Sequence, residues 1–395
     1  MKLAVVTNIL TPYRVPLFSM MARCVEDFTV FLMAEQEENR QWQIGPVPFK
    51  TKVLNGFHFK PPSSDVSLHW NYGVLSALRR ADPDMVLSGG FTPANIAAFV
   101  YCKLSRKAYV GWGEFTLRDG AQSSRLKRWV RRWLTSQATG CIASSTEARE
   151  AFLHYGAEQH SLLTVLMPIE ADRINREAQA FRVSSAYQER RSRFTHSTLL
   201  SVGRLTDLKG IRHLFSIYER ILAERPDVSL LVVGDGPDRQ AYEAYVQHRG
   251  WRHVHFLGFV SPDLLPQYFA LADVFLFPTL SDTYGAVLAE AMAAECVVVS
   301  SSFAAATPDL VRHGSTGFAM NPTLHQAAAD IVLDVLAMSK GERAAIGGAA
   351  YEVVRHTDIR CSTDSMIGFL GSLVSRPDSF VKDSTVDRIV SAGMF

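Results

Sequence analysis

Short, almost unbroken apolar segments alternate along this chain with longer segments of mixed polarity. Uninterrupted apolar strands are typical of parallel sheets covered by helices on both faces, whereas half-exposed strands alternate apolar and polar residues. The intervening segments carry helical patterns. The pattern therefore predicts an α/β protein with two similar halves, each built around a parallel sheet. The expected strands are 3–7, 28–34, 85–88, 108–112 and 140–144 in the first half, and 198–203, 228–234, 273–278 and 296–301 in the second.

A highly charged segment, residues 172–195, separates the halves and carries no strand pattern. We therefore expect an amino-terminal domain over residues 1–171, a linker over 172–195 and a carboxyl-terminal domain over 196–375. The final segment, 376–395, is expected to include a helix that crosses back onto the first domain. Ligands of open parallel sheets bind at the carboxyl ends of the strands, so two Rossmann-like domains facing a central cleft would bind their ligands there.

Composition excludes several classes of protein. A chain of 395 residues is too long for one ordinary core, and its 47% hydrophobic and 20% charged residues are typical of a globular protein. No apolar stretch approaches the about 18 residues of a membrane-spanning helix, and the apolar start lacks a cleavage site, so it predicts a buried strand. A net charge of +2 argues against a general nucleic-acid binder. Five widely spaced cysteines fit neither a zinc site nor a disulfide framework, which favours a cytoplasmic location.

One carboxylate, Glu290, stands inside an apolar helical segment, residues 286–294. A charge in such surroundings costs on the order of several kcal/mol unless hydrogen-bond donors meet it. The vicinal diol of a ribose would supply two donors. Asp282 lies eight residues upstream in a polar turn, so a ligand at the start of the helix would meet both acids. Two interpretations stay open, a nucleotide-sugar site or neutralisation of Glu290 by a structural arginine or lysine.

A glycine-containing loop, residues 202–210, follows the first strand of the second half. It carries Arg204 and Lys209 between Gly203 and Gly210, and the glycines give the backbone freedom to wrap an anion. Such a pair of cations could hold a diphosphate without a metal. A solvated pair of charges is the alternative.

Two further glycine turns follow strands of the second half. The segment VVGDGPDR, residues 232–239, turns at Gly234, but it lacks the third glycine of a dinucleotide fingerprint, so NAD binding is not favoured. The segment HFLGFV, residues 255–260, ends in another glycine turn whose backbone could address a base edge. Each of these turns taken alone is a common feature of loops.

In this order and spacing, the four segments resemble glycosyltransferase family 4, whose members are retaining enzymes of the GT-B fold. The resemblance covers essentially the whole second half and, more loosely, the first. It implies that Arg204 and Lys209 bind the donor diphosphate, that Glu290 binds the ribose, and that Asp282 contacts the sugar. It also implies backbone contacts, from Thr283, Tyr284 and Gly285 to the sugar and phosphate and from Phe259 and Val260 to the base.

The chain departs from the family pattern at three places. Family members usually have glutamate where Asp282 stands. Because the aspartate side chain is shorter, the identity of the donor sugar stays open. A glycine-rich turn commonly follows their first strand, whereas this chain has Arg14, which would replace backbone amides at the phosphate or serve as a cap or ion-pair partner. Many members have a histidine after the strand that corresponds to residues 108–112, where this chain has Trp112 and Glu114. Glu114 would orient the acceptor or remain an ordinary loop acid.

Residues 125–134 have the pattern of a basic amphipathic helix. Such a helix binds anionic membrane surfaces, which would suit an enzyme with a lipid-linked acceptor. The alternative is that the apolar stripe packs on the core of the first domain while the arginines face water. The stripe consists of Leu126, Trp129, Val130, Trp133 and Leu134, and the cations are Arg125, Lys127, Arg128, Arg131 and Arg132.

Together these features predict a metal-independent hexosyltransferase or related retaining glycosyltransferase of class EC 2.4. It would move a sugar from a nucleoside diphosphate to a hydroxyl of a glycan or lipid-linked glycan, in the biosynthesis of a surface polysaccharide or glycolipid. No cofactor and no nucleic-acid partner are expected, and the location would be cytoplasmic, at the inner face of the membrane. A sugar-nucleotide 2-epimerase and a non-catalytic sugar-nucleotide binder remain the alternatives.

Overall fold

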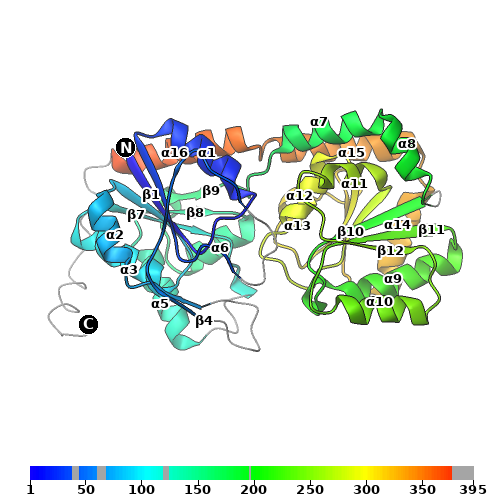
Figure 1. The fold of residues 1–395 in the computed structure, drawn as a ribbon, viewed down its shortest axis with the longest axis horizontal. Helices are drawn as coiled ribbons and strands as arrows, with labels where there is room; N and C mark the ends of the chain where they lie inside the picture. Colours follow the sequence, from blue (N-terminus) through cyan, green and yellow to red (C-terminus); the bar gives the residue numbers. More distant parts are fainter. Residues whose placement is uncertain (38–43, 60–67, 119–123, 195–196, 376–395) are drawn as a thin grey trace. The chain divides into compact units, whose positions relative to one another are not determined.

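The structure is a computed structural model that describes residues 1–37, 44–59, 68–118, 124–194 and 197–375 (Figure 1). Its residues form two compact units. The first unit is Met1–Val165 together with the residues from Thr363 onward, and the second is Leu166–Ser362. The expected crossing helix in 376–395 lies outside the described residues.

The first unit is built on a seven-stranded parallel sheet, in the order β3-β2-β1-β6-β7-β8-β9. The chain places β2 on one side of β1 and β6 on the other, so the strand order reverses between β1 and β6. Five of these strands confirm the apolar segments expected from the sequence, while β3 and β9 were missed. The strands are β1 (Lys2–Thr7), β2 (Asp27–Leu32), β3 (Lys50–Val53), β6 (Met85–Gly89), β7 (Ala108–Gly113), β8 (Gly140–Ala143) and β9 (Leu162–Thr164).

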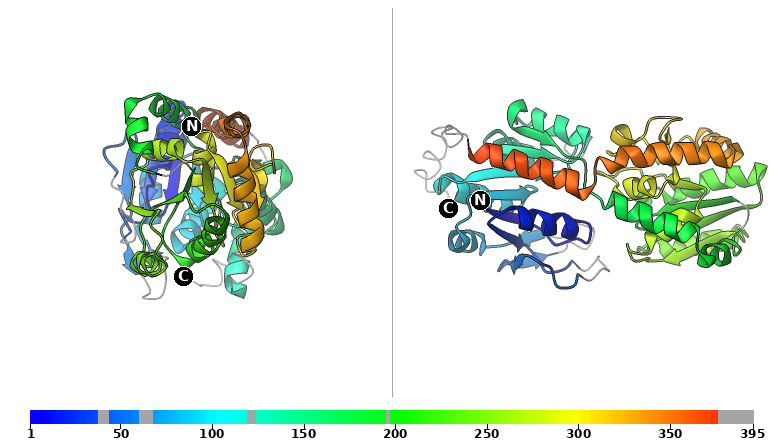
Figure 2. Two further views of the ribbon diagram at one scale, coloured as in Figure 1. Left: turned by 90° about the vertical axis from the view of Figure 1, so that its right-hand side faces the viewer. Right: turned by 90° about the horizontal axis from the view of Figure 1, so that it is seen from above.

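Helices cover both faces of this sheet because successive residues of a strand point to opposite sides. Leu3 and Val5 of β1 pack with α1 and α16, whereas Ala4 and Val6 pack with α2, α3 and α5. Figure 2 shows α16 lying beside α1 on the outside of this unit. The helices are α1 (Arg14–Cys24), α2 (Val74–Ala81), α3 (Pro93–Leu104), α5 (Arg125–Ser136), α6 (Thr146–His154), the short η1 (Gln159–Ser161) and α16 (Ile359–Val374).

A separate antiparallel hairpin, β4 (Phe57–Phe59) and β5 (Leu68–Trp70), is attached to the first unit. It forms a two-stranded sheet of its own. Its strand β5 packs against α3.

The second unit has a six-stranded parallel sheet in the order β12-β11-β10-β13-β14-β15. Here the order reverses between β10 and β13. The strands are β10 (Ser197–Val202), β11 (Val228–Val233), β12 (Val254–Gly258), β13 (Val274–Phe277), β14 (Val297–Ser301) and β15 (Phe318–Met320). One face packs on α9 (Ile211–Glu224), α10 (Arg239–His248) and α14 (His325–Ala337), and the other on α7 (Ala171–Arg182), α11 (Leu265–Leu271), α12 (Ala286–Ala293) and α15 (Lys340–Arg355).

The segment expected as a linker has a different structure. Residues 172–194 belong to α7 and α8 (Ser185–Arg191) of the second unit, and the chain passes between the units at Val165/Leu166 and again at Ser362/Thr363. The charges of α7 lie on its outer side, because its apolar residues recur at helical spacing and pack on the second core. These buried residues are Ala171, Ile174, Ala178 and Phe181.

Candidate functional site

The residues expected to bind a donor gather at the carboxyl edge of the second sheet. The loop with Arg204 and Lys209 follows β10, and the turn with Asp282 follows the neighbouring strand β13. The strand order reverses between these two strands, and open parallel sheets bind ligands at such a switch point. Gly234 and Phe259 follow β11 and β12 at the same edge.

The loops after β10 and β13 are bonded to each other. The carbonyl of Leu208 accepts hydrogen bonds from the backbone N–H of Leu280 at 2.9 Å and from the hydroxyl of Thr279 at 3.3 Å. Gly210 has φ 72°, and a Cβ there would lie 1.9 Å from the carbonyl oxygen of Pro278. The loop that carries Lys209 can therefore approach the β13 turn this closely only with glycine at position 210.

This approach brings two predicted site residues into direct contact. The ammonium of Lys209 donates to Asp282 at 2.5 Å, and the backbone N–H of Tyr284 donates to the other carboxylate oxygen of Asp282 at 3.2 Å. Both side chains are half-buried, with relative exposures of 27% and 18%. The sequence predicted both residues at the site, but it did not predict this ion pair, which holds both groups at the start of α12.

Glu290 lies in the middle of α12 and is half-buried. Burial raises the pKa of its carboxyl group to about 7, and Arg173 partly opposes that rise. Among the residues that the structure describes, no hydrogen bond or ion pair meets the Glu290 carboxylate. Arg173 instead pairs with Glu170 and Glu177, each at 2.9 Å. The structural alternative, neutralisation by a bonded arginine or lysine, is therefore not what the structure shows.

Glycines allow the remaining loops of this edge to pack closely. Gly234 has φ 129°, and a Cβ there would lie 1.9 Å from the carbonyl oxygen of Gly203. Gly285 has φ 92° and caps α12. The side chain of Tyr284 is buried and that of Thr283 is exposed. The first turn of α12 offers backbone N–H groups without intrahelical partners, a favourable environment for an anion.

The turn after β12 presents an apolar surface beside these loops. Phe259 is 47% exposed and Val260 is half-buried. The carbonyl of Gly258 accepts from the N–H of Gly234 at 2.8 Å, which joins this turn to the loop after β11. An exposed aromatic ring at this edge provides an apolar platform on which a planar base could pack.

The first unit has a second cluster at its own switch point. Arg14, the first residue of α1, donates to Glu114 after β7 at 3.0 Å and to the Thr7 hydroxyl at the end of β1 at 3.0 Å. Its guanidinium lies 4.7 Å from the centre of the Trp112 ring. Trp112 is buried and donates to the Ser144 hydroxyl at 3.1 Å. The ion pair that was one expected role of Arg14 is therefore present, and the Trp112 ring packs against the Arg14 guanidinium.

Sequence reasoning missed the hydrogen-bonded groups that continue from this cluster. The Asn8 amide donates to Glu37 at 3.4 Å, and His69 Nε2 lies 3.2 Å from the same carboxylate oxygen. His69 Nδ1 in turn lies 2.9 Å from His58 Nδ1 on the paired strand of the hairpin. The four residues are far apart in the sequence, and no spacing between them signals a contact.

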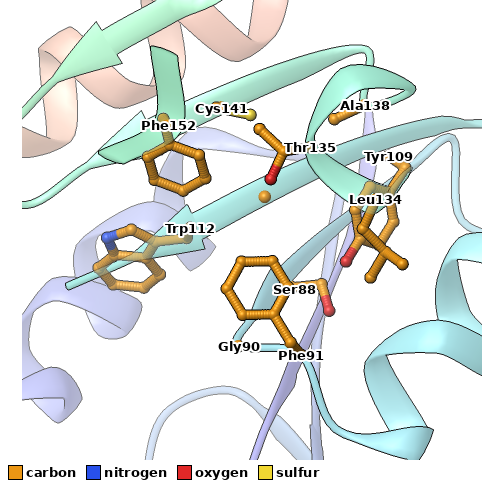
Figure 3. Close-up of a pocket in the computed structure, with 11 residues that line it drawn as sticks. Ser88, Gly90, Phe91, Tyr109, Trp112, Leu134, Thr135, Ala138, Cys141 and Phe152 are labelled. Carbon is orange, nitrogen blue, oxygen red and sulfur yellow. The ribbon is translucent and has the colours of Figure 1, made fainter. Parts of the chain in front are cut away.

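A small pocket in the first unit lies beside Trp112 (Figure 3). The hydroxyl of Thr135 points into it, and the remaining walls are mostly apolar (Figure 3). None of its lining residues is charged, so this pocket lacks the groups that would hold a phosphate. Its lining consists of Ser88, Gly90, Phe91, Tyr109, Gly111, Trp112, Leu134, Thr135, Ala138, Cys141 and Phe152.

Most of the second unit is similar to a known family of sugar-transferring proteins. Residues 188–353 match the family model described as glycosyl transferases group 1. This range contains the loops after β10, β11, β12 and β13, which carry the residues expected to bind a donor. The match supports the general resemblance and leaves the finer assignment to family 4 as a proposal.

Curated relatives share part of the chain. An uncharacterised glycosyltransferase of Methanocaldococcus jannaschii is 38% identical over 125 residues, which are 31% of this chain and 32% of the relative. The sulfoquinovosyl transferase of Arabidopsis thaliana is 30% identical over 197 residues, 47% of this chain and 36% of the relative. The matched segment thus spans about a third of the length of these two relatives.

Solved structures match nearly the whole length of the chain. Anabaena HepE, solved in complex with UDP and glucose, has a TM-score of 0.72 at 19% identity and covers 94% of this chain and 100% of its own. A glycosyltransferase from Rickettsia africae has a TM-score of 0.73 at 11% identity, with coverage of 95% and 99%. With its two Rossmann-like parallel-sheet units, the chain has the GT-B fold.

Proposed function

We propose that this protein is a retaining glycosyltransferase of family 4 that uses a nucleoside-diphosphate sugar as donor. The observation that carries the proposal is the Glu290 carboxylate, which is half-buried, has no bonded partner among the described residues and belongs to α12, the helix that begins just after Asp282 of the Lys209–Asp282 pair. A donor nucleotide would supply the missing hydroxyl donors to Glu290 and a diphosphate to the cations.

Each loop of the donor edge has a role in this proposal. Arg204 and Lys209 bind the diphosphate, together with the backbone at the start of α12. Glu290 binds the ribose, and Asp282 contacts the transferred sugar while Lys209 holds its carboxylate in place. The ring of Phe259 and the backbone of Val260 face the base.

The transfer step follows from this arrangement. The bond between the sugar C1 and the diphosphate oxygen breaks, and a bond from C1 to the acceptor oxygen forms on the same face. The acceptor proton passes to the departing phosphate oxygen, so no protein nucleophile is required. The charge that develops on the leaving diphosphate is met by Arg204 and Lys209, which supports metal-independent transfer by positioning and electrostatics.

The acceptor is proposed to be a hydroxyl of a glycan or of a lipid-linked glycan, in surface polysaccharide or glycolipid biosynthesis. One similar protein, from Mycobacterium tuberculosis, is named a GDP-mannose-dependent phosphatidylinositol monomannoside mannosyltransferase, and 30% identity over 165 residues relates it to this chain. The Arg14–Glu114 pair lies in the first unit, where Glu114 would orient the acceptor hydroxyl. A cytoplasmic location at a membrane surface, with α5 as a contact, completes the proposal. Among the described residues, no helix has the length and apolar character needed to cross a bilayer.

The test begins with a thermal-shift panel of UDP- and GDP-sugars on the wild type and on Glu290→Gln. Glutamine keeps the volume and removes the charge that would accept from the ribose, so donor affinity should fall by about 2 kcal/mol. The control is Glu295→Gln, because Glu295 is already bonded to Asn175 and Gln179 at 3.0 and 2.7 Å. Equal donor affinity in wild type and Glu290→Gln would show that this carboxylate does not bind the ribose.

A second measurement separates transfer from the alternatives. A transferase releases nucleoside diphosphate when an acceptor glycan is added, and mass spectrometry then detects the extended glycan. A non-catalytic binder releases none, and a 2-epimerase changes the donor without any acceptor.

A further inference from the structure

The β4–β5 hairpin carries an exposed aromatic surface. Phe57, Phe59, Trp70 and Tyr72 are 71%, 62%, 63% and 63% exposed. We name these four residues the aromatic face. Large apolar side chains normally lose most of their exposure on folding, and such a cluster on a surface marks an interaction site.

The strand pairing explains why these rings point outward. Phe57 pairs directly with Trp70, so both side chains lie on the same side of the hairpin, and Phe59 lies on that side two residues along. The intervening pair, His58 and His69, occupies the opposite side.

That opposite side is fixed to the first unit. His69 reaches the buried carboxylate of Glu37, and the Asn71 amide donates to the carbonyls of Met33 and Leu54 at 2.8 and 3.2 Å. Gly56 also lies close to the neighbouring strand, since a Cβ there would be 2.5 Å from the carbonyl oxygen of Trp70. The hairpin is therefore held by its polar side, and the aromatic face is presented to the surroundings.

The helix α5 carries a second exposed apolar group together with cations. Its carboxyl-terminal half packs on the core through Leu134, but Leu126 and Trp129 of its first turns are 69% and 55% exposed. The ring of Trp129 stacks on that of Trp133, with 5.7 Å between the ring centres, and lies on the exposed side of this pair. The expected packing of the whole stripe on the core thus holds only for the second half of the helix.

The cations of α5 also divide into two groups. Arg131 turns inward, where its guanidinium lies 5.6 Å from the ring centres of both Phe91 and Phe115. Arg125, Lys127 and Arg132 are exposed, and none of them forms an ion pair within the described part of the chain. The sequence of α5 contains no acidic residue.

Both elements flank α3. The strand β5 packs against α3, and the ring of Trp133 lies 4.8 Å from that of Phe99 in the same helix. Figure 1 shows β4 and α5 along the same lower edge of the first unit. We propose that the aromatic face and the exposed residues of α5 form one surface that binds an anionic lipid bilayer.

The chemistry of the surface favours a bilayer over a glycan. Phe57 and Phe59 have no polar atom that could pair with a sugar hydroxyl, whereas aromatic rings at a membrane enter the boundary between headgroups and acyl chains. The exposed cations Arg125, Lys127 and Arg132 of α5 complement anionic headgroups. The inference extends the membrane contact within the proposed function, and its test measures lipid binding instead of sugar transfer, so the two can fail separately.

The experiment is co-sedimentation of the full chain with two kinds of vesicle, phosphatidylcholine alone and phosphatidylcholine mixed with phosphatidylglycerol, at low and high salt. Replacing Phe57, Phe59 and Trp70 together with serine should weaken binding to the mixed vesicles about 10-fold or more, because the apolar area that enters the interface is lost. Replacing Arg125, Lys127 and Arg132 with glutamine should weaken it by on the order of 100-fold at low salt and much less at high salt.

Matched controls come from the second unit. Val183→Ser with Leu324→Ser removes two apolar residues that are 87% and 58% exposed, and glutamine at Arg252, Arg312 and Lys340 removes three exposed cations. Both controls should bind vesicles as the wild type does, and thermal melting checks that every variant is folded.

Three results would overturn the proposal. The first is unchanged vesicle binding in both test variants. The second is equal loss of binding in the second-unit controls, which would indicate adsorption without a defined surface. The third is failure of the wild type to sediment with the mixed vesicles while the aromatic variant loses affinity for a soluble acceptor glycan, which would assign the aromatic face to a glycan.

Discussion

At the scale of single residues, the charges at the carboxyl edge of the second sheet differ in how they are paired. Lys209 and Asp282 neutralise each other directly, whereas the Glu290 carboxylate has no bonded partner among the residues that the structure describes and is influenced by the charge of Arg173. The Lys209–Asp282 pair therefore costs little free energy to hold in the folded protein. The Glu290 carboxylate is held at a cost in free energy, which a bound ligand with hydrogen-bond donors would reduce.

Glu290 should make stability depend on pH in a specific direction. Burial raises the pKa of Glu290 from 4.5 to about 7, so between these values the unfolded chain loses a proton that the folded chain keeps. The free energy of unfolding should therefore fall as pH rises from about 4.5 to about 7, by on the order of 3 kcal/mol. Urea denaturation across this range should show that contribution in the wild type and not in Glu290→Gln. Identical pH profiles for the two proteins would contradict the raised pKa.

The cations of the β10 loop should act on turnover more than on folding. Arg204→Ala and Lys209→Ala should each lower the turnover of donor by on the order of 100-fold or more, as expected for loss of one preorganised charge at a leaving group. EDTA should leave the wild type nearly unaffected, because the proposed clamp needs no divalent ion. Donor turnover with and without EDTA measures both effects.

The control for these variants is Arg212→Ala. Arg212 is an exposed arginine on the adjoining helix α9 and pairs with Asp207 at 2.7 Å, so its loss should leave turnover near the wild-type value. Abolition of activity by EDTA with rescue by magnesium would refute a metal-independent clamp.

At the scale of elements, the loops at the carboxyl edge of the second sheet are held in place because loops from neighbouring strands fit against each other. The β10 loop crosses so close to the β13 turn that Gly210 adopts φ 72° with Pro278 at contact distance. In the same way, the first unit holds its hairpin by the buried side of β5 and leaves the other side exposed. Local sequence fixes each element, and these close approaches fix the relative positions of the loops.

Gly210→Ala should destabilise the protein. The added Cβ would meet the Pro278 carbonyl at 1.9 Å, and the left-handed backbone conformation itself costs about 1–3 kcal/mol in a residue other than glycine. The free energy of unfolding measured in urea should fall by at least that amount. Gly203→Ala is the matched control, because a Cβ there meets nothing within 4 Å, and its stability should stay close to that of the wild type.

At the scale of the whole molecule, the chain crosses between its two units twice and returns to the first unit in α16. Met366, Leu370 and Leu373 of this helix are buried in the same cluster as Leu17 and Phe18. The first unit is therefore completed by residues that follow the entire second unit in the sequence.

Leu370→Ala should weaken the first unit selectively. Removing a fully buried leucine side chain typically costs about 2–5 kcal/mol, and calorimetry should show this loss in the transition of the first unit only. A sugar nucleotide, which is proposed to bind the second unit, should raise the melting temperature of the second unit's transition. Ser372→Ala, at an exposed position of the same helix, should change neither of the two unfolding transitions. A single transition shifted equally by both perturbations would show that the units do not unfold separately.

The sequence by itself determined most of the strands and predicted which loops would carry the residues of the proposed donor site. Apolar segments gave β1, β2, β6, β7, β8, β10, β11, β13 and β14, because a parallel strand buried on both faces must be apolar throughout. Glu290 was found for a related reason, since a carboxylate in an apolar helix has few low-energy environments. Five short strands were missed, because strands of three or four residues leave too little pattern to detect; they are the edge strands β3, β9 and β15 and the hairpin strands β4 and β5.

Only the tertiary structure decided which of these residues meet. The pairing of Lys209 with Asp282, 73 residues apart, and the contact of Glu37 with His69 depend on how the strands are arranged, which local patterns do not encode. The charged segment 172–195 was expected as a linker, but packing of one side of α7 on the second core made this helix part of that unit. Periodicity is a property of neighbouring residues, so the sequence pattern predicted the helices and strands. Strand order and long-range packing depend on the free energy of the whole chain, so only the folded structure brought the residues of the candidate site together.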